Sequence, residues 1–172
     1  MSATGVRVVR LDGPARLPQV LAAIHGAFAE YEGKLAPPSA AMKETVDSLA
    51  RRLAAGALFV AEDADGTVIG AVCAERKGEA IYLDRLAVPP AARGRGVAAA
   101  LVAAVEAFAA ETGAASVTLG VRLALADNIG MFERLGYVET ARTAHPGFDR
   151  PTSASMAKPV GRGPGGRGPG GR

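Results

Sequence analysis

The chain has 172 residues, of which 49% are hydrophobic and 22% charged, and a net charge of +3; this profile suits one globular domain with a buried core and excludes a largely disordered chain. The only cysteine, Cys73, rules out an intramolecular disulfide, so nothing indicates an oxidising compartment. No apolar run approaches the roughly 20 residues of a membrane span, and the alternating Val and Arg near the start are untypical of a signal peptide, so we expect a cytoplasmic protein.

The first third of the chain is predicted to hold one strand followed by two helices. A short strand is expected over 6–11, and apolar residues recur at helical spacing over 17–31. A proline pair ends that helix, and Ser39 is predicted to cap a second helix that ends at Gly56. The apolar face of this second helix is predicted to consist of Met42, Val46, Leu49 and Leu53.

The rest of the chain is predicted to form three strands and then alternating helices and strands. A long helix follows Gly96 and ends at Gly113, and a short helix begins at Asp127 or Asn128. The predicted strands cover 58–62, 68–75, 81–88, 117–121, 137–143 and 152–158. This order implies an α/β fold, with a mixed sheet and helices on both of its faces.

The segment that joins the third of these strands to the long helix carries the clearest functional signal. A strand ending at Val88 is followed by two prolines and then by Arg93-Gly94-Arg95-Gly96-Val97-Ala98. The first amides of a helix have no partner within it, and together with the helix dipole they favour a bound anion. Glycine also lets the backbone approach a ligand without an intervening Cβ. We therefore interpret this segment as a pyrophosphate site.

Three interpretations of the glycine motif compete. A plain turn between strand and helix is the commonest role of such a pair. The dinucleotide pattern G-x-G-x-x-A fits 94–99, but it requires an acid about 20 residues further on, at the end of the next strand, and Glu111 falls in the predicted helix. The third interpretation, Arg93-x-x-Gly96-x-Ala98, resembles the coenzyme A pyrophosphate loop of the GNAT acyltransferase superfamily, and we favour it.

A second motif supports this resemblance. The sequence Phe132-Glu133-Arg134-Leu135-Gly136-Tyr137 is similar to the family's Y-E-K-L-G-F, and the two motifs lie at the family's usual separation. The resemblance covers roughly 6–158, which gives a predicted domain of 1–160. It implies the GNAT fold and an N-acetyltransferase that moves an acetyl group from acetyl-CoA to a primary amine by direct attack in a ternary complex.

The resemblance also implies where coenzyme A lies. In the family, the strand corresponding to 81–88 separates from the one corresponding to 117–121, and the pantetheine arm lies between them. Main-chain groups of Leu86, Ala87 and Val88 would bind that arm as an added strand would. The amides from Arg93 to Ala98 would hold the pyrophosphate, and holding both reactants lowers the entropic cost of bringing them together.

The sequence departs from the family pattern near the reacting sulfur. The family's thiolate-protonating tyrosine falls on Phe132, and an asparagine seven residues earlier falls on Leu125. We count Phe132 and Asn128 among the cofactor-site residues, although Asn128 has a helix cap as its other candidate role. The thiolate would then leave directly or take its proton from water, since a thiol pKa of about 8.5 makes it a tolerable leaving group. The alternative function is a noncatalytic acyl-CoA-binding module.

Candidates for the base that deprotonates the amine lie on the strand before the loop. Tyr82 falls near a glutamate of some family members, and Asp84 points to the same face of a regular strand. Each has a plainer interpretation, Tyr82 as a wall of the acceptor pocket and Asp84 as the ion-pair partner of Arg85 or Arg93. The acidic stretch at 30–32 lies in a loop that often lines the acceptor site in this fold.

No metal site and no nucleic-acid site are expected. His25, His145 and Cys73 have no metal-ligand partners at a useful spacing. The tail at 161–172 repeats Pro-Gly-Gly-Arg and is predicted to be disordered, but it lacks the interleaved aromatic residues of nucleic-acid-binding tracts. We expect a small-molecule or peptide amine as partner, no membrane association, and a monomer or a homodimer.

Overall fold

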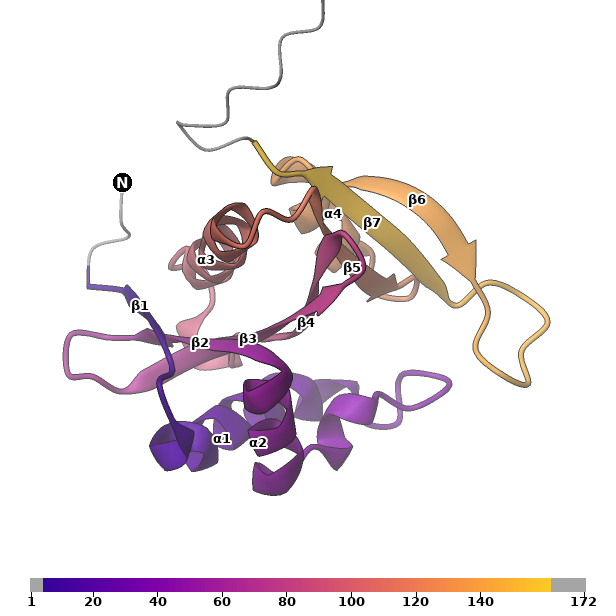
Figure 1. The fold of residues 1–172 in the computed structure, drawn as a ribbon. Coiled ribbons are helices and arrows are strands. Elements are labelled where there is room, and N and C mark those ends of the chain that lie inside the picture. The colour runs from indigo at the N-terminus through magenta and orange to yellow at the C-terminus, as the bar shows by residue number, and fades with distance from the viewer. Residues whose placement is uncertain (1–4, 162–172) are drawn as a thin grey trace, which may run out of the picture.

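A seven-stranded mixed sheet forms the centre of the structure, a computed structural model that describes residues 5–161 (Figure 1). In spatial order β1-β2-β3-β4-β5-β7-β6, the neighbours β4 and β5 are parallel and the other described neighbours are antiparallel. This arrangement confirms the predicted mixed sheet. The strands are β1 (Arg7–Arg10), β2 (Gly56–Glu62), β3 (Val68–Lys77), β4 (Ala80–Ala87), β5 (Ser116–Arg122), β6 (Val138–Thr143) and β7 (Ser153–Pro159).

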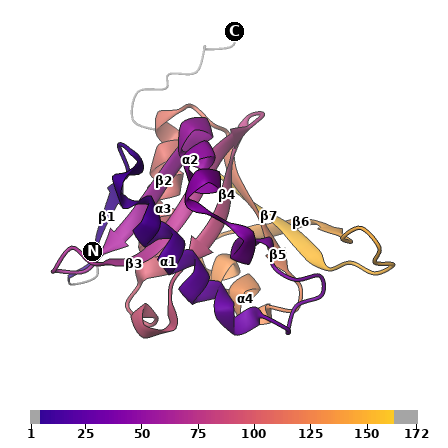
Figure 2. The same ribbon diagram turned by 90° about the horizontal axis from the view of Figure 1, so that it is seen from below.

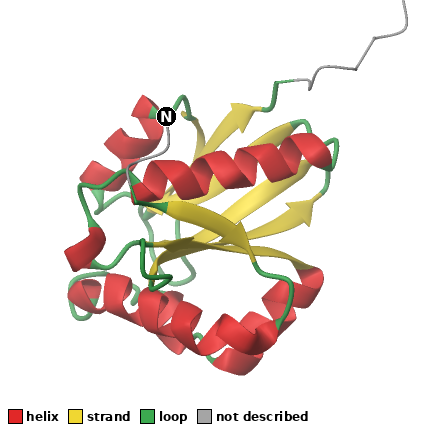
Figure 3. Cartoon of the chain, turned by 90° about the vertical axis from the view of Figure 1, so that its left-hand side faces the viewer, coloured by secondary structure: helices red, strands yellow, loops and turns green. Residues whose placement is uncertain are grey.

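Helices cover both faces of this sheet, as predicted (Figure 3). One core cluster joins the sheet to α3 and to apolar residues of α4, and a second cluster joins the other face to α1 and α2; Figure 2 views the molecule from the α1 and α2 side. The helices are α1 (Leu17–Phe28), α2 (Val46–Ala55), α3 (Val97–Glu111) and α4 (Ala126–Arg134), and the short 3-10 turns are η1 (Pro14–Arg16), η2 (Ala29–Tyr31), η3 (Ala40–Lys43) and η4 (Pro90–Ala92).

Strand alternation decides which side chains of β4 and β5 meet each helical layer. Leu83 of β4 and Leu119 of β5 are buried in the cluster beneath α3. Because successive side chains of a strand point to opposite faces, Tyr82, Asp84 and Gly120 lie on the face that α1 and α2 cover. Two predicted catalytic residues are thus separated by the sheet from the layer that contains α3.

The second helix begins later than the sequence predicts. Ser39 caps only the short turn η3, and α2 starts at Val46 behind a capping box that Thr45 and Ser48 form. The extended backbone of Glu44 separates the two turns, so the single long helix that Ser39 was predicted to cap is wrong. One consequence is that Glu44 is brought into the interior, with a relative exposure of 6%.

Gly70 of β3 lets the first turns of α3 lie close to the sheet. A Cβ placed on Gly70 would be 2.7 Å from Val97 Cγ1, 3.1 Å from Leu101 Cδ1 and 3.2 Å from the Ala87 carbonyl oxygen. Since Val97 is the first residue of α3, this glycine sets how closely the N-terminus of α3 approaches β3 and β4.

We expect Gly70→Ala to lower the free energy of unfolding by about 1–3 kcal/mol, the usual cost of overpacking a core. Urea unfolding measures this change. Gly130→Ala in α4 is the matched control, because the added Cβ would meet only Arg134 Nη1, at 3.4 Å, and the exchange should raise helix stability by up to about 1 kcal/mol. Equal destabilisation by both substitutions would contradict the close approach at Gly70.

Candidate functional site

The loop between β4 and α3 presents a row of free amides. Gly94 and Gly96 adopt left-handed φ values of 77° and 74°, and Gly96 occupies the N-cap of α3 without a side-chain cap. Within residues 5–161, no group accepts a hydrogen bond from the amides of 94–99. A Cβ added to Gly94 would meet no atom within 4 Å, so the loop is open on that side. Unpaired donors at the start of a long helix favour an anion.

Arg93 braces this loop and does not extend the row of free amides. Its own backbone amide donates to the Pro90 carbonyl at 3.2 Å, so in this structure that amide is engaged within the turn, and its role toward a phosphate stays a prediction. Its guanidinium donates from Nε to the Val88 carbonyl at 3.0 Å and pairs through Nη2 with Glu30 Oε1 at 2.5 Å. The hydrogen bond from Arg93 lowers the pKa of Glu30. Arg93 thus ties the end of β4 to η2, while Arg95 is exposed.

The parallel strands β4 and β5 pair only over their first residues. Their register joins Ala80 to Ser116 and ends at Tyr82 opposite Thr118, whereas β5 continues to pair with β7 as far as Arg122. The edge of β4 that faces β5 is therefore unpaired from Leu83 to Ala87. Leu86 and Ala87, two of the residues predicted to bind an extended arm, lie on this edge. Val88, the third, lies just beyond it, and its carbonyl accepts from Arg93 Nε at 3.0 Å.

A bulge in β4 accompanies this separation. Cys73 of β3 opposes Asp84 and Ala71 opposes Ala87, so three steps along β4 match two along β3. Arg85 takes up the extra residue with a φ of 52°, in the left-handed region that a residue with a Cβ enters at a cost. Its carbonyl and amide are therefore turned away from a regular ladder, within the part of β4 that has already left β5.

A network of four charged side chains holds the bulge. The carboxylate of Glu44 accepts from Arg52 Nε at 2.9 Å, from Arg85 Nε at 3.0 Å and from the Ser48 hydroxyl. Asp84 accepts from Arg52 Nη1 at 2.9 Å and from the Arg85 amide at 2.9 Å. The charges balance, and they connect α2 to β4. Sequence reasoning missed Glu44 and Arg52 because their partners are 41 and 32 residues away.

These contacts occupy Asp84, one of the two predicted catalytic residues. Its ion-pair partners are Arg85 and Arg52, while Arg93, the other predicted partner, pairs with Glu30. A carboxylate that accepts hydrogen bonds on both oxygens is a weaker candidate for a base than a free one.

Tyr82, the other predicted catalytic residue, lies where β4 and β5 part. It belongs to the last parallel pair, opposite Thr118, and the Lys77 ammonium lies 4.1 Å from the centroid of its ring. A Cβ added to Gly120 would lie 3.3 Å from the Tyr82 hydroxyl oxygen, so the phenol reaches across to β5. Burial raises the pKa of Tyr82, which keeps the phenol protonated near neutral pH and suits a proton donor better than a base.

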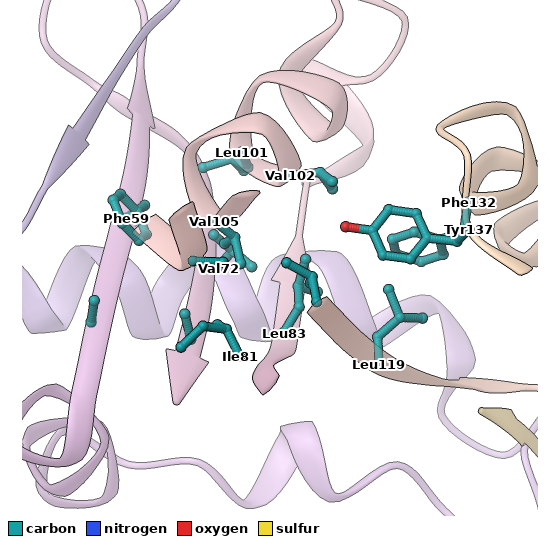
Figure 4. Close-up of a cluster of buried hydrophobic side chains, with 14 of the residues drawn as sticks. Phe59, Val72, Ile81, Leu83, Leu101, Val102, Val105, Leu119, Phe132 and Tyr137 are labelled. Atoms are coloured by element: carbon teal, nitrogen blue, oxygen red, sulfur yellow. The ribbon is translucent and has the colours of Figure 1, made fainter. Parts of the chain in front are cut away.

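Phe132 of α4, predicted to line the cofactor site, is a core residue. It is 6% exposed and lies edge-on to the ring of Tyr137, with centroids 5.6 Å apart (Figure 4). The Tyr137 hydroxyl donates to Glu106 Oε2 at 3.2 Å, and burial raises the pKa of Tyr137. Neither ring therefore offers a free acidic proton on the α3 side of the sheet.

Asn128 does not cap α4, because the helix begins at Ala126 with Leu125 at the N-cap. The backbone N–H of Asn128 donates to the Leu125 carbonyl at 3.0 Å. The Asn128 side chain lies near the hydroxyl of Tyr31, whose pKa burial raises, with Asn128 opposing part of that rise. The first turn of α4 is thus in contact with η2, the turn that also carries Glu30.

Within residues 5–161, no group of three or more His, Cys, Asp and Glu side chains is placed to hold a metal ion. Across the same described range, no helix is long and apolar enough to cross a membrane. Cys73 lies buried in the cluster beneath α1 and α2, and burial raises its pKa to about 12, so its thiol is unreactive. The predicted tail lies outside the described residues except for Gly161.

Taken together, these features place a row of free amides at the N-terminus of α3, an arrangement suited to an anion, with an unpaired edge of β4 alongside. A family model described as the acetyltransferase (GNAT) family matches residues 22–137. The chain belongs to this family of acetyl-CoA-dependent acyltransferases. The matched range includes the glycine loop and ends at Tyr137, the last residue of the second motif.

Solved structures share the fold. The ribosomal-protein-S18-alanine N-acetyltransferase from Escherichia coli matches with a TM-score of 0.71 at 20% identity, over 93% of this chain and 97% of that one. The PaiA N-acetyltransferase from Thermoplasma acidophilum, in complex with coenzyme A, matches with a TM-score of 0.76 at 15% identity, over 91% of this chain and 99% of that one. A GCN5-related N-acetyltransferase from Kribbella flavida matches with a TM-score of 0.72 at 24% identity, over 92% of this chain and 100% of that one. A comparison with curated proteins gives no match.

Proposed function

We propose that the protein transfers the acetyl group of acetyl-CoA to a primary amine by direct attack in a ternary complex. The observation that carries this proposal is the row of free amides at 94–99, next to the unpaired edge of β4. The amides of this loop bind the pyrophosphate, and main-chain groups of Leu86, Ala87 and Val88 bind the pantetheine arm. The acyl group then lies where β4 and β5 part, beside Tyr82.

The reaction forms a bond between the amine nitrogen and the acyl carbon and breaks the bond from that carbon to sulfur. The coenzyme A thiolate leaves with the electron pair of that bond. Tyr82, whose pKa burial raises, gives its phenolic proton to this thiolate from the face opposite α3 and regains a proton from water. Asp84 is held by Arg52 and Arg85 and positions the strand. Water takes the proton of the attacking amine, and positioning supplies much of the rate.

A calorimetric titration with acetyl-CoA, run beside NADH, tests the donor site. Micromolar binding of acetyl-CoA alone is expected, whereas binding of NADH alone would favour the dinucleotide interpretation. Release of free thiol with a panel of small-molecule amines and peptides then tests catalysis. Acetyl-CoA binding without thiol release from any amine would favour the noncatalytic module, and no binding of acetyl-CoA would overturn the proposal.

Tyr82→Phe tests the assigned proton donor. With an amine that the panel identifies, we expect kcat to fall about 100-fold, within the usual range for one acid or base group, because the ring remains and only the hydroxyl is lost. KM for acetyl-CoA should change little, since the pyrophosphate and pantetheine contacts come from other residues. Steady-state kinetics measures both constants, and an unchanged kcat would remove Tyr82 from the mechanism.

A further inference from the structure

The side chain of Tyr82 packs over Gly120 on the face of the sheet opposite α3. Tyr82 stands in the last parallel pair of β4 and β5, and its hydroxyl lies over Gly120, two residues beyond its partner Thr118. Gly120 has no side chain to fill that place, so the phenol occupies the space that a β5 side chain would take. The Lys77 ammonium, 4.1 Å from the ring centroid, lies against the ring.

The path of the acyl-CoA arm along β4 follows from where the free amides and the unpaired strand edge lie. The free amides lie at the N-terminus of α3, and α3 packs on the face that buries Leu83 and Leu119. The unpaired edge of β4 runs from Leu83 to Ala87, a length of about 13 Å for an extended strand. An arm that follows this edge from the loop reaches the point where the strands rejoin. That point is Tyr82.

We propose that the ring of Tyr82, seated over Gly120, limits the length of the acyl group that the protein accepts to about that of acetyl. This inference rests on the proposed function, because it requires an acyl-CoA arm along β4. The parallel strand pair closes the passage at Tyr82 and Thr118, and the phenol covers the exit toward the face of α1 and α2. A longer acyl chain meets the ring.

Calorimetric titration with coenzyme A, acetyl-CoA, butyryl-CoA and hexanoyl-CoA tests this inference without an amine. For the unmodified protein we expect hexanoyl-CoA to bind about 10-fold or more weakly than acetyl-CoA, the low end of what a pocket achieves against one excess methylene. Tyr82→Ala should raise the affinity for hexanoyl-CoA relative to acetyl-CoA by about 10-fold or more. Tyr82→Leu, which keeps an apolar side chain on the strand, should move the ratio in the same direction.

Tyr82→Phe is the matched control, because it removes the hydroxyl and keeps the ring; it should retain the acetyl preference. Unacylated coenzyme A is the internal control for folding, since its affinity should be the same in every variant. Equal binding of acetyl-CoA and hexanoyl-CoA to the unmodified protein, or an unchanged ratio in both Tyr82→Ala and Tyr82→Leu, would overturn the inference alone. Failure of every protein to bind coenzyme A would overturn the proposed function and this inference with it.

Discussion

Gly96→Glu should weaken the binding of acetyl-CoA by about 100-fold or more, equivalent to roughly 3 kcal/mol. Gly96 stands at the N-cap of α3 with a φ of 74°, so a glutamate there places its carboxylate among the free amides that we propose as the pyrophosphate site. The carboxylate repels the phosphate charges and also competes for the same donors. Calorimetric titration with acetyl-CoA measures the loss directly and needs no amine.

Gly113→Glu is a close control for this change. Gly113 has the same φ of 74° and, like Gly94, no atom within 4 Å of an added Cβ, but it follows the other end of α3. Both variants therefore carry the same left-handed strain, about 1–2 kcal/mol, and the same added charge. Gly113→Glu should bind acetyl-CoA as the unmodified protein does. A similar loss of affinity in both variants would show that strain, and not the anion site, causes it.

The glycine loop was predictable because its information is local. A strand end, two glycines and the start of a helix lie within a few residues, and their backbone requirements follow from residue type alone. The mixed sheet followed likewise from the order of periodic segments. The misplaced start of α2 has a local cause too, since the capping box of Thr45 and Ser48 competes with the cap at Ser39 and wins.

The charged network at the bulge could not be predicted in this way. Glu44 and Arg85 are far apart in the sequence, and nothing in the spacing of either residue indicates the other. The bulge itself also changes what a regular strand would predict, because Arg85 takes the extra position. The engaged amide of Arg93 has a similar origin, since it depends on the turn η4 that the proline pair introduces. Only the folded chain brings these groups together.

The pH dependence of stability should reveal Glu44 within this network. Burial raises the pKa of Glu44, but hydrogen bonds from Ser48, Arg52 and Arg85 outweigh burial, and the pKa lies below its ordinary value. A carboxyl whose pKa is lower in the folded state contributes stability that is complete above its unfolded pKa, about 4.3, and is lost as the pH falls through its folded value. Glu44→Gln should therefore flatten the fall of unfolding free energy in acid, measured by urea unfolding from about pH 6 to about pH 3.

Arg52→Met should lower the free energy of unfolding by about 3 kcal/mol, because it leaves a buried carboxylate with fewer partners. Arg16→Met makes the same change elsewhere, since Arg16 and Arg52 are 28% and 25% exposed and their partners Glu62 and Glu44 are 6% and 5% exposed. Each glutamate also keeps a second arginine. A smaller loss of stability is therefore expected from Arg16→Met at neutral pH, because Arg16 pairs with Glu62 alone, whereas Arg52 pairs with Asp84 as well as Glu44.

Binding of acetyl-CoA separates the two variants, because only Arg52 holds the bulge. Arg52 donates to Asp84, which in turn accepts the amide of Arg85, the residue with the left-handed backbone. Without Arg52 the edge of β4 loses its fixed shape. A displaced edge should lower the affinity for acetyl-CoA by about 10-fold. Arg16 lies by the hairpin between β2 and β3, so Arg16→Met should leave the affinity unchanged. Equal affinities in the two variants would mean that the network stabilises the fold without shaping the donor site.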